Sequence, residues 1–174
     1  MSPSDNSGYL NALKGFAIAL KRSYGSVVSA QQEDQLKGPT GDLLSGFGTE
    51  FGLNVIPRFE APVRGVGRPD IALDVGGALC GYVELKAPQV SVRNLRGRDR
   101  EQFNKFKTLP NLVYTNGNEW ILYQDGEKAT TKRLYREGEF VRLAAENPDY
   151  EDIVVAAEEV AVQGCVVKVI HTPR

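Results

Sequence analysis

The chain has 174 residues, of which 41% are apolar and 25% are charged. This composition is typical of a globular domain, and a chain of this length buries roughly 70% of the surface of its extended state, so it needs no disulfide framework to hold a core. The 21 basic and 22 acidic side chains leave a net charge of −1, which by itself does not indicate a nucleic-acid partner.

The small number of cysteines and histidines restricts the chemistry open to the chain. Cys80 and Cys165 are too few for a zinc site made of cysteines, and the single histidine, His171, lies close to the end of the sequence. Any catalytic centre is therefore expected to use carboxylates, lysines and backbone groups. No apolar run reaches the roughly 20 residues of a membrane span and no signal-peptide pattern opens the chain, so we expect a cytoplasmic location.

The first part of the chain has helical periodicity. Apolar side chains at helical spacing predict a helix over residues 9–24, and a second helix is expected to begin near Ser29. The glycines and the proline of residues 37–41 must bend or break this second helix, and residues 42–51 are expected to continue as a further helical piece.

From Asn54 onward the pattern changes to strands. The expected strands are residues 54–60, 71–75, 79–86, 111–115, 119–123 and 129–135. One short helix is expected between the third and fourth strands, at residues 98–107. From about Phe140 the tail is expected to be helical, with a helix start at Pro148, before a final apolar run at residues 165–170. The order predicts an α/β fold with a mixed sheet flanked by helices. We expect a single domain over residues 1–174, with a core at 9–135 and an acidic helical segment at 136–174.

Two short segments carry charged side chains at the ends of predicted strands. Arg68-Pro69-Asp70 opens one strand, and Glu84-Leu85-Lys86 ends the next. Because alternate side chains of a strand share a face, Glu84 and Lys86 point to the same side and Leu85 points into the core.

The turn between these strands decides whether Asp70 joins this pair. A three-residue loop at residues 76–78 places Asp70 opposite Glu84. A two-residue loop places it opposite Val83, on the other face, unless Gly81 supplies a compensating bulge. A shared site requires the first register or the bulge.

Two neighbouring carboxylates repel each other unless a cation lies between them. Hard oxygen ligands favour Mg²⁺, and we expect Mn²⁺ to substitute for it. Asp70 and Glu84 are the expected metal ligands, the backbone carbonyl of Leu85 could add another, and Lys86 could activate water. This chemistry fits metal-assisted hydrolysis of a phosphodiester.

Asp70, Glu84 and Lys86 together resemble the active-site signature of the restriction-endonuclease-like superfamily, named PD-(D/E)XK. The segments that follow, 101–106, 109–115 and 119–127, appear in an order that resembles the N-terminal nuclease domain of single-polypeptide restriction-modification enzymes, in which a nuclease is fused to a methyltransferase. The resemblance covers about residues 30–130. It implies a restriction-endonuclease-like central mixed sheet flanked by helices.

The resemblance also implies an activity, partners and further site residues. An acidic residue of the preceding helix joins the metal site, for which Glu33 matches best and Asp42 and Glu50 are alternatives, and Gln102 supports the site. The implied activity is that of a Mg²⁺-dependent deoxyribonuclease, a type II or type I-like restriction endonuclease domain that leaves a 5′-phosphate and acts in phage defence. The implied partners are double-stranded DNA and a methyltransferase or specificity domain.

Charge is distributed unevenly along the sequence. Residues 86–107 hold seven basic and two acidic side chains, whereas residues 137–159 hold eight acidic and one basic. Basic side chains beside the predicted centre would contact DNA phosphates. The expected DNA-binding residues are Arg64, Arg68, Arg93, Arg96, Arg98 and Lys105.

Two alternatives remain open from the sequence. The chain could be a catalytically inactive module on the same fold that binds nucleic acid or a partner protein. It could also be an α/β interaction domain in which the charged segments coincide by chance.

Overall fold

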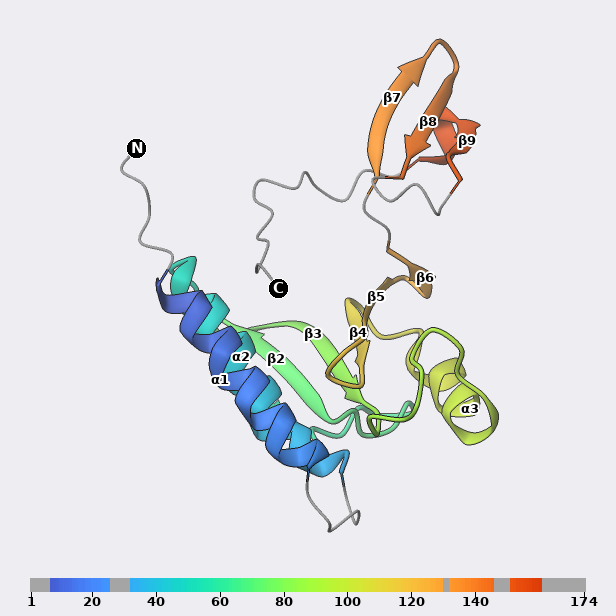
Figure 1. Ribbon diagram of the computed structural model, residues 1–174. Helices are drawn as coiled ribbons and strands as arrows, with labels where there is room; N and C mark the ends of the chain where they lie inside the picture. Colours follow the sequence, from blue (N-terminus) through green and yellow to red (C-terminus); the bar gives the residue numbers. More distant parts are fainter. Residues whose placement is uncertain (1–6, 26–31, 130–131, 146–150, 161–174) are drawn as a thin grey trace. The chain divides into compact units, whose positions relative to one another are not determined.

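A six-stranded mixed sheet is the framework of the first part of the chain in the computed structural model (Figure 1). The structure describes residues 7–25, 32–129, 132–145 and 151–160. The chain divides into two compact units, residues 1–129 and 130–174, and each is described by itself. The elements of the first unit are α1 (Ser7–Tyr24), η1 (Asp34–Leu36), α2 (Lys37–Glu50), β1 (Val55–Phe59), β2 (Ile71–Val75), β3 (Ala78–Leu85), α3 (Gly97–Phe106), β4 (Leu112–Thr115), β5 (Trp120–Gln124) and β6 (Glu127–Lys128).

The strands follow one another in chain order across this sheet, from β1 to β6. Only the β3–β4 pair is parallel, and α3 lies in the connection between those two strands. The other paired neighbours are antiparallel. The predicted α/β class with a mixed sheet is confirmed.

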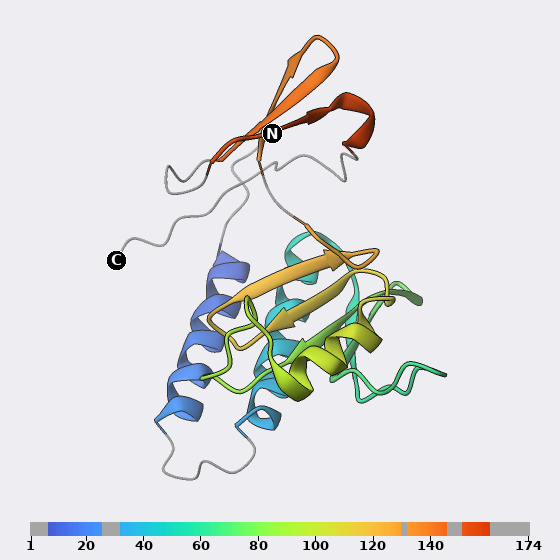
Figure 2. The ribbon, with the colours of Figure 1, turned by 90° about the vertical axis from the view of Figure 1, so that its right-hand side faces the viewer.

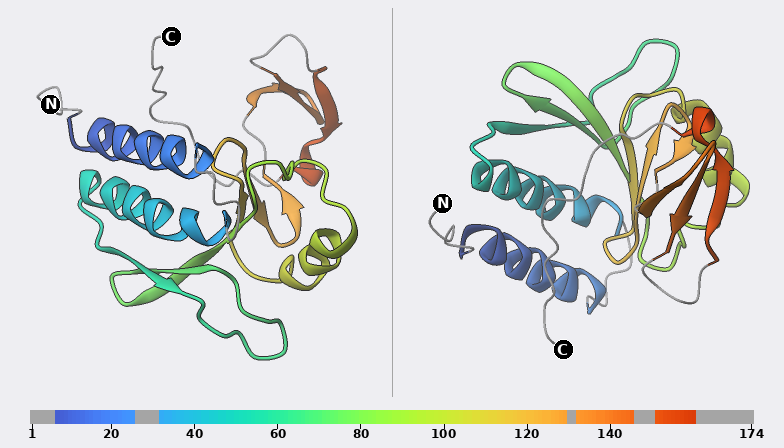
Figure 3. Two further views of the ribbon diagram at one scale, coloured as in Figure 1. Left: turned by 60° about the horizontal axis from the view of Figure 1, so that its bottom comes forward. Right: turned by 90° about the horizontal axis from the view of Figure 1, so that it is seen from above.

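Helices cover the two faces of the sheet. α1 and α2 run antiparallel on one face, and α3 lies against the other (Figures 2 and 3). Val83 and Leu85 are fully buried in the layer under α1 and α2, whereas Tyr82 and Tyr114 belong to the layer under α3. Because strand side chains alternate, Glu84 points to the α3 face and Leu85 into the opposite core, as predicted.

The β2–β3 turn has two residues, which is the second of the two loop lengths that the sequence left open. Val75 pairs with Ala78, and both Gly76 and Gly77 have positive φ, at 61° and 87°. A two-residue hairpin of this kind needs positive φ at both positions, which glycine adopts without strain.

A bulge restores the alignment that this short turn would otherwise lose. Asp74 pairs with Leu79, but Leu73 pairs with Gly81, so Cys80 is the extra residue. The bulge lies beside the predicted position, Gly81. It shifts the register by one residue and brings the start of β2 back into step with the end of β3.

α2 begins where the sequence predicted a break. Residues 34–36 form a 3-10 turn, and the α-helix starts at Lys37 and runs through Pro39 to Glu50. Proline is tolerated in a first helical turn because the N–H that it lacks has no partner within the helix there. The predicted helix start at Ser29 lies outside the described residues.

The second unit is a three-stranded antiparallel sheet of β7 (Arg133–Glu137), β8 (Phe140–Ala144) and β9 (Ile153–Ala156), followed by the 3-10 turn η2 (Ala157–Glu159). The predicted helical tail is therefore wrong within the part that the structure describes. β7 and β8 pair from Arg133 with Ala144 to Glu137 with Phe140, and Gly138 turns between them with φ of 69°.

Some predictions about the ends of the chain are not tested. The predicted helix start at Pro148 and the apolar run at residues 165–170 fall outside the described residues. The boundary between the two units lies close to the predicted end of the core at residue 135, and the single domain itself stays a prediction. None of the helices described combines the length and apolar character needed to span a membrane. The cytoplasmic location likewise stays a prediction.

Replacing Gly81 with alanine is expected to lower the free energy of unfolding by about 2 kcal/mol. A Cβ at this position would lie 2.5 Å from the carbonyl oxygen and 2.9 Å from the Cβ of Asn111, the residue before β4, so the β3–β4 pairing would have to shift. The measurement is urea denaturation of both proteins.

The matched control is Gly15→Ala in α1, where a Cβ meets nothing within 4 Å. This variant is expected to gain about 0.5–1 kcal/mol, because alanine is the better helix former. Equal stability of the two variants would contradict the close packing at Gly81.

Candidate metal centre

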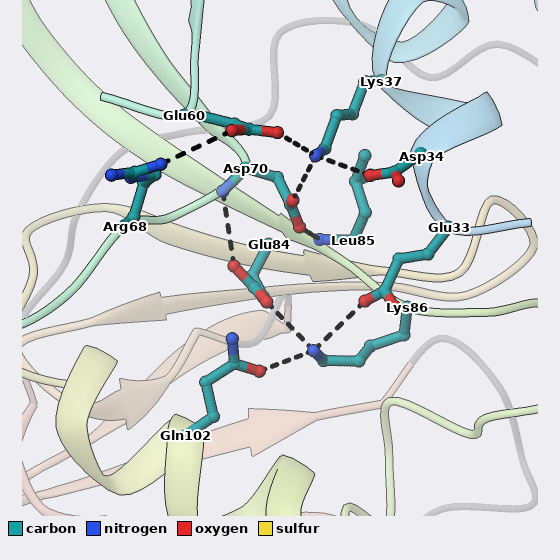
Figure 4. A network of polar contacts seen from close by, with 10 residues as sticks. All are labelled: Glu33, Asp34, Lys37, Glu60, Arg68, Asp70, Glu84, Leu85, Lys86 and Gln102. Carbon is teal, nitrogen blue, oxygen red and sulfur yellow. Dashed lines mark hydrogen bonds and ion pairs between the residues drawn. The ribbon is translucent and has the colours of Figure 1, made fainter. Parts of the chain in front are cut away.

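Three carboxylates converge at the carboxyl end of β3. One oxygen of each of Glu33, Asp70 and Glu84 lies within 4.8 Å of the others. Asp70 directly precedes β2, Glu84 is the last but one residue of β3, and Glu33 stands in the turn before η1 (Figure 4). Strand pairing thus supplies two of the carboxylates, and the segment before α2 supplies the third.

Backbone hydrogen bonds hold Asp70 in place. Its Oδ2 accepts a hydrogen bond of 2.8 Å from the N–H of Leu85, and its own N–H donates to Glu84 Oε2 at 3.4 Å. The first bond joins the start of β2 to the end of β3, so the spacing of the two carboxylates is fixed by the sheet and not by flexible side chains alone.

Lys86 is a buried cation beside this cluster. Its Nζ donates to Gln102 Oε1 at 2.6 Å, to Glu84 Oε1 at 3.0 Å and to Glu33 Oε1 at 3.3 Å. Asp99 is on the same helix as Gln102, and its Oδ1 lies 3.4 Å from Nζ of Lys86. The side chain of Lys86 is 5% exposed, so this ammonium is desolvated and depends on these acceptors.

Burial changes the protonation of the cluster. Burial and then the charge of Asp70 raise the pKa of Glu84 to about 7. Burial also raises the pKa of Glu33, although Lys86 opposes this shift. For Lys86, burial lowers the pKa, but the charge of Glu84 and the hydrogen bond to it outweigh burial and hold the pKa above its ordinary value.

A second lysine, Lys37, contacts the cluster from the first turn of α2. Its Nζ lies 2.7 Å from Asp34 Oδ1, 2.7 Å from Glu60 Oε1 and 3.2 Å from Asp70 Oδ1. Burial lowers the pKa of Lys37, but the hydrogen bonds to these three carboxylates raise it well above its ordinary value overall. The side chain therefore carries a positive charge at neutral pH.

These groups surround an open cavity of about 540 Å³. Its lining is almost entirely charged, with Arg68 and Arg98 contributing positive charge beside the carboxylates. The lining residues are Glu33, Asp34, Arg68, Asp70, Glu84, Lys86, Arg98, Asp99 and Gln102.

The carboxylate cluster fits a hard divalent cation. Oxygen ligands of one Mg²⁺ or Mn²⁺ lie about 3 to 4 Å apart, and Ca²⁺ allows about 5 Å. The separations within 4.8 Å are close to these values, and the side chain of Glu33, which is 40% exposed, has room to adjust. Glu33, Asp70 and Glu84 could therefore hold such an ion.

The structure brings together the five side chains predicted for the centre: Glu33, Asp70, Glu84, Lys86 and Gln102. Their roles stay predictions. The two alternatives for the third acid lie elsewhere, because Asp42 is exposed on α2 and Glu50 lies beside Gly8. Leu85 takes part through its N–H; a contribution of its carbonyl stays a prediction.

The six predicted DNA-binding residues are placed less uniformly. Arg68 and Arg98 line the cavity. Arg93 pairs with Glu119 at 3.0 Å, in a contact that holds the loop before α3. The remaining three, Arg64, Arg96 and Lys105, are exposed and do not belong to the cavity lining.

Sequence reasoning missed four charged residues of the network, Asp34, Lys37, Glu60 and Asp99. Spacing offered a signal for three of them. Lys37 follows Asp34 by three residues, and Asp99 precedes Gln102 by three, and residues three apart share a helix face. The contact of Lys37 with Glu60 and Asp70 had no such signal, because it joins segments far apart in the sequence.

Comparison with known proteins gives three likenesses. The model of the Peptidase S24-like family matches residues 110–167, about a third of the chain. The LexA repressor of Dechloromonas aromatica (strain RCB) is 27% identical over 167 residues, which cover 88% of this chain and 83% of that protein. A chain in the cryo-electron microscopy structure of the DrdV-DNA complex has a similar fold, with a TM-score of 0.55 and 22% identity over 70% of this chain and 84% of that one.

The first two likenesses contradict the predicted family. They are to an S24-like peptidase family and to a LexA repressor, not to the restriction-endonuclease-like superfamily. The predictions that depended on that family, a Mg²⁺-dependent deoxyribonuclease of a restriction-modification system and a role in phage defence, are therefore not retained.

The matched segment does not carry over a peptidase mechanism either. S24 peptidases are serine peptidases, and residues 110–167 contain no serine, the last one in the chain being Ser91. A serine peptidase needs that hydroxyl as its nucleophile. The likeness to this family therefore does not assign peptidase activity to the chain.

The raised pKa of Glu84 predicts a pH dependence of stability. The pKa rises from an ordinary 4.5 to about 7, so folding favours the protonated carboxyl. The resulting stability is complete below about pH 4.5 and is lost as the pH rises through 7, a loss of about 3 kcal/mol. Urea denaturation of the metal-free protein from pH 4 to 8 should show this loss in the wild type and not in Glu84→Gln.

Glu101→Gln is the control, because Glu101 is an exposed carboxylate of α3. It should keep the wild-type pH profile. Wild-type behaviour of Glu84→Gln over the same range would show that Glu84 does not titrate as the structure implies.

Proposed function

We propose that this chain binds DNA at the cavity beside β3, with a divalent cation held by Glu33, Asp70 and Glu84. The observation that carries the proposal is the placing of two arginines, Arg68 and Arg98, beside three carboxylates whose oxygens lie within 4.8 Å of one another. Carboxylates alone would repel a DNA phosphate, whereas a cation between them and two guanidinium groups beside them would attract it.

The comparisons support a DNA partner without specifying how DNA is bound. One similar protein is the LexA repressor of Dechloromonas aromatica, and one solved chain of similar fold comes from a complex with DNA. Double-stranded DNA is the form proposed here, and nothing found bears on a methyltransferase partner.

Mg²⁺ is the proposed resident ion, with Mn²⁺ as its substitute. When bound, such an ion supplies positive charge and coordination positions that a phosphate oxygen can take. The residues of the chain do the remaining work. Asp70 is oriented by the N–H of Leu85, Glu84 must lose its proton to become a ligand, and Gln102 and Asp99 hold Lys86 beside the cluster.

We propose that the central sheet has the arrangement of a restriction-endonuclease-like core, as a statement about architecture and not about activity. The parallel β3–β4 pair with α3 in its connection and the helices on both faces support it.

DNA affinity should depend on the cation. Fluorescence anisotropy with a labelled 30-base-pair duplex, at constant ionic strength, is expected to give at least about fivefold tighter binding in Mg²⁺ than in EDTA, because the ion converts a repulsive cluster into an attractive one. In Asp70→Asn this dependence on Mg²⁺ should fall below about twofold.

The control for this measurement is Asp42→Asn, an exposed carboxylate on α2 outside the cluster. It should retain the wild-type response to Mg²⁺. The DNA is recovered and run on a gel so that any change in its length is seen. Equal wild-type affinity in Mg²⁺ and in EDTA would contradict the proposal.

Arg68 and Arg98 are expected to contact phosphates. Replacing either with alanine should weaken binding to all sequences alike and reduce the slope of log K against log salt by about 0.9. Arg22→Ala, at an exposed position of α1 that does not belong to the cavity lining, should leave both unchanged. Loss of affinity for one sequence alone would assign the arginine to base contacts instead.

A further inference from the structure

We propose that Lys37 is an internal counter-ion of the acidic cluster, which competes with the divalent cation for Asp70 and so limits the affinity of the site. This inference rests on the cation site proposed above. It assigns to a residue of α2 a part in cation binding that neither the strand motif nor the comparisons indicate.

The contacts of Asp70 carry the argument. Both of its carboxylate oxygens are already engaged, Oδ2 by the N–H of Leu85 and Oδ1 by Nζ of Lys37 at 3.2 Å. A cation bound to Asp70 Oδ1 at about 2.1 Å would therefore lie within about 5.3 Å of the ammonium group, since both would contact the same oxygen. Like charges at that separation repel strongly in a partly buried site.

Lys37 is held where it is by groups outside the cluster. Asp34 and Glu60 each lie 2.7 Å from its Nζ, closer than Asp70 does. They come from η1 and from the residue after β1, so they tether the ammonium from two directions (Figure 4). The side chain of Lys37 is 16% exposed, so water screens its charge only in part.

Lys86 differs from Lys37 in this respect. Besides Glu33 and Glu84, it has Gln102 and Asp99 on α3 as acceptors. It can keep these two partners when a cation takes the carboxylates. Lys37 is held by Asp34 and Glu60, which are not proposed metal ligands, and its third contact is with Asp70, which is one.

The test is isothermal titration calorimetry of the full metal-free chain with MnCl₂. Lys37→Met keeps the length of the side chain and removes its charge, so it is expected to bind Mn²⁺ at least about tenfold more tightly than the wild type. Lys37→Arg keeps the charge and is expected to stay within about threefold of the wild type. Because Lys37 also neutralises the cluster when no ion is bound, Lys37→Met should have the lower melting temperature in EDTA.

Lys14→Met is the matched control. Lys14 is exposed on α1, in the half of that helix where Ala12 packs against Gly46. Gly46 lies nine residues along α2 from Lys37, about 14 Å at the helical rise. The affinity of Lys14→Met for Mn²⁺ should equal that of the wild type.

Each outcome decides between the alternatives. Equal or weaker Mn²⁺ binding by Lys37→Met, with normal binding by the wild type, overturns the inference and leaves the cation site standing. Binding by Lys37→Met alone supports the inference. If neither protein binds Mn²⁺, both the inference and the cation site are overturned. Should Lys37→Met fail to fold, as seen by circular dichroism, Lys37→Gln replaces it with the same expectation.

Discussion

The hydrogen bond between the N–H of Leu85 and the carboxylate of Asp70 is the contact on which the candidate site depends. It forms only when the start of β2 lies level with the end of β3. That alignment also places Glu84 beside Asp70, with Tyr82 on the same face and Leu85 in the opposite core. Packing of the apolar residues therefore sets the strand faces, and the faces set where the charges meet.

Electrostatic balance explains the composition of the network. Carboxylates this close to one another, one of them buried, are tolerable only with compensation. The chain compensates in two ways. The pKa of Glu84 is raised to about 7, and two ammonium groups lie in contact with the carboxylates of Asp70 and Glu84. One ammonium, Lys86, is buried with a second set of partners, and the other, Lys37, is attached to the ligand Asp70. A centre balanced in this way can remain folded with or without a divalent ion.

The sequence predicted the strands and the grouping of Glu84 with Lys86, because both follow from the two-residue period of a strand. It left the position of Asp70 open, since turn length and bulge act on the register in opposite directions. It could not reveal Lys37 as a neighbour of Asp70, because that contact joins α2 to the sheet and leaves no local pattern. The tail was wrongly predicted as helical, although Ile153, Val154 and Val155 are β-branched residues of the kind that favours strands. The family was inferred from a short motif and the order of the segments after it, and the comparisons contradict it. The placing of Asp70, Glu84 and Lys86 rested on strand geometry and did not require the family, whereas Glu33 and Gln102 were predicted from the resemblance alone.

The pairing of a short turn with a bulge has a consequence for how the hairpin can vary. A deletion at Cys80 combined with an insertion after Gly77 would give a regular hairpin with a three-residue loop and the same alignment of Asp70 with Glu84. Deletion of Cys80 alone would also keep Asp70 opposite Glu84, because it removes only the unpaired residue and leaves the five paired positions between the turn and the carboxylates unchanged. The hairpin is thus constrained in the number of paired positions between its turn and the two carboxylates more than in its total length, and insertions or deletions of unpaired residues are the variation that this centre can accept.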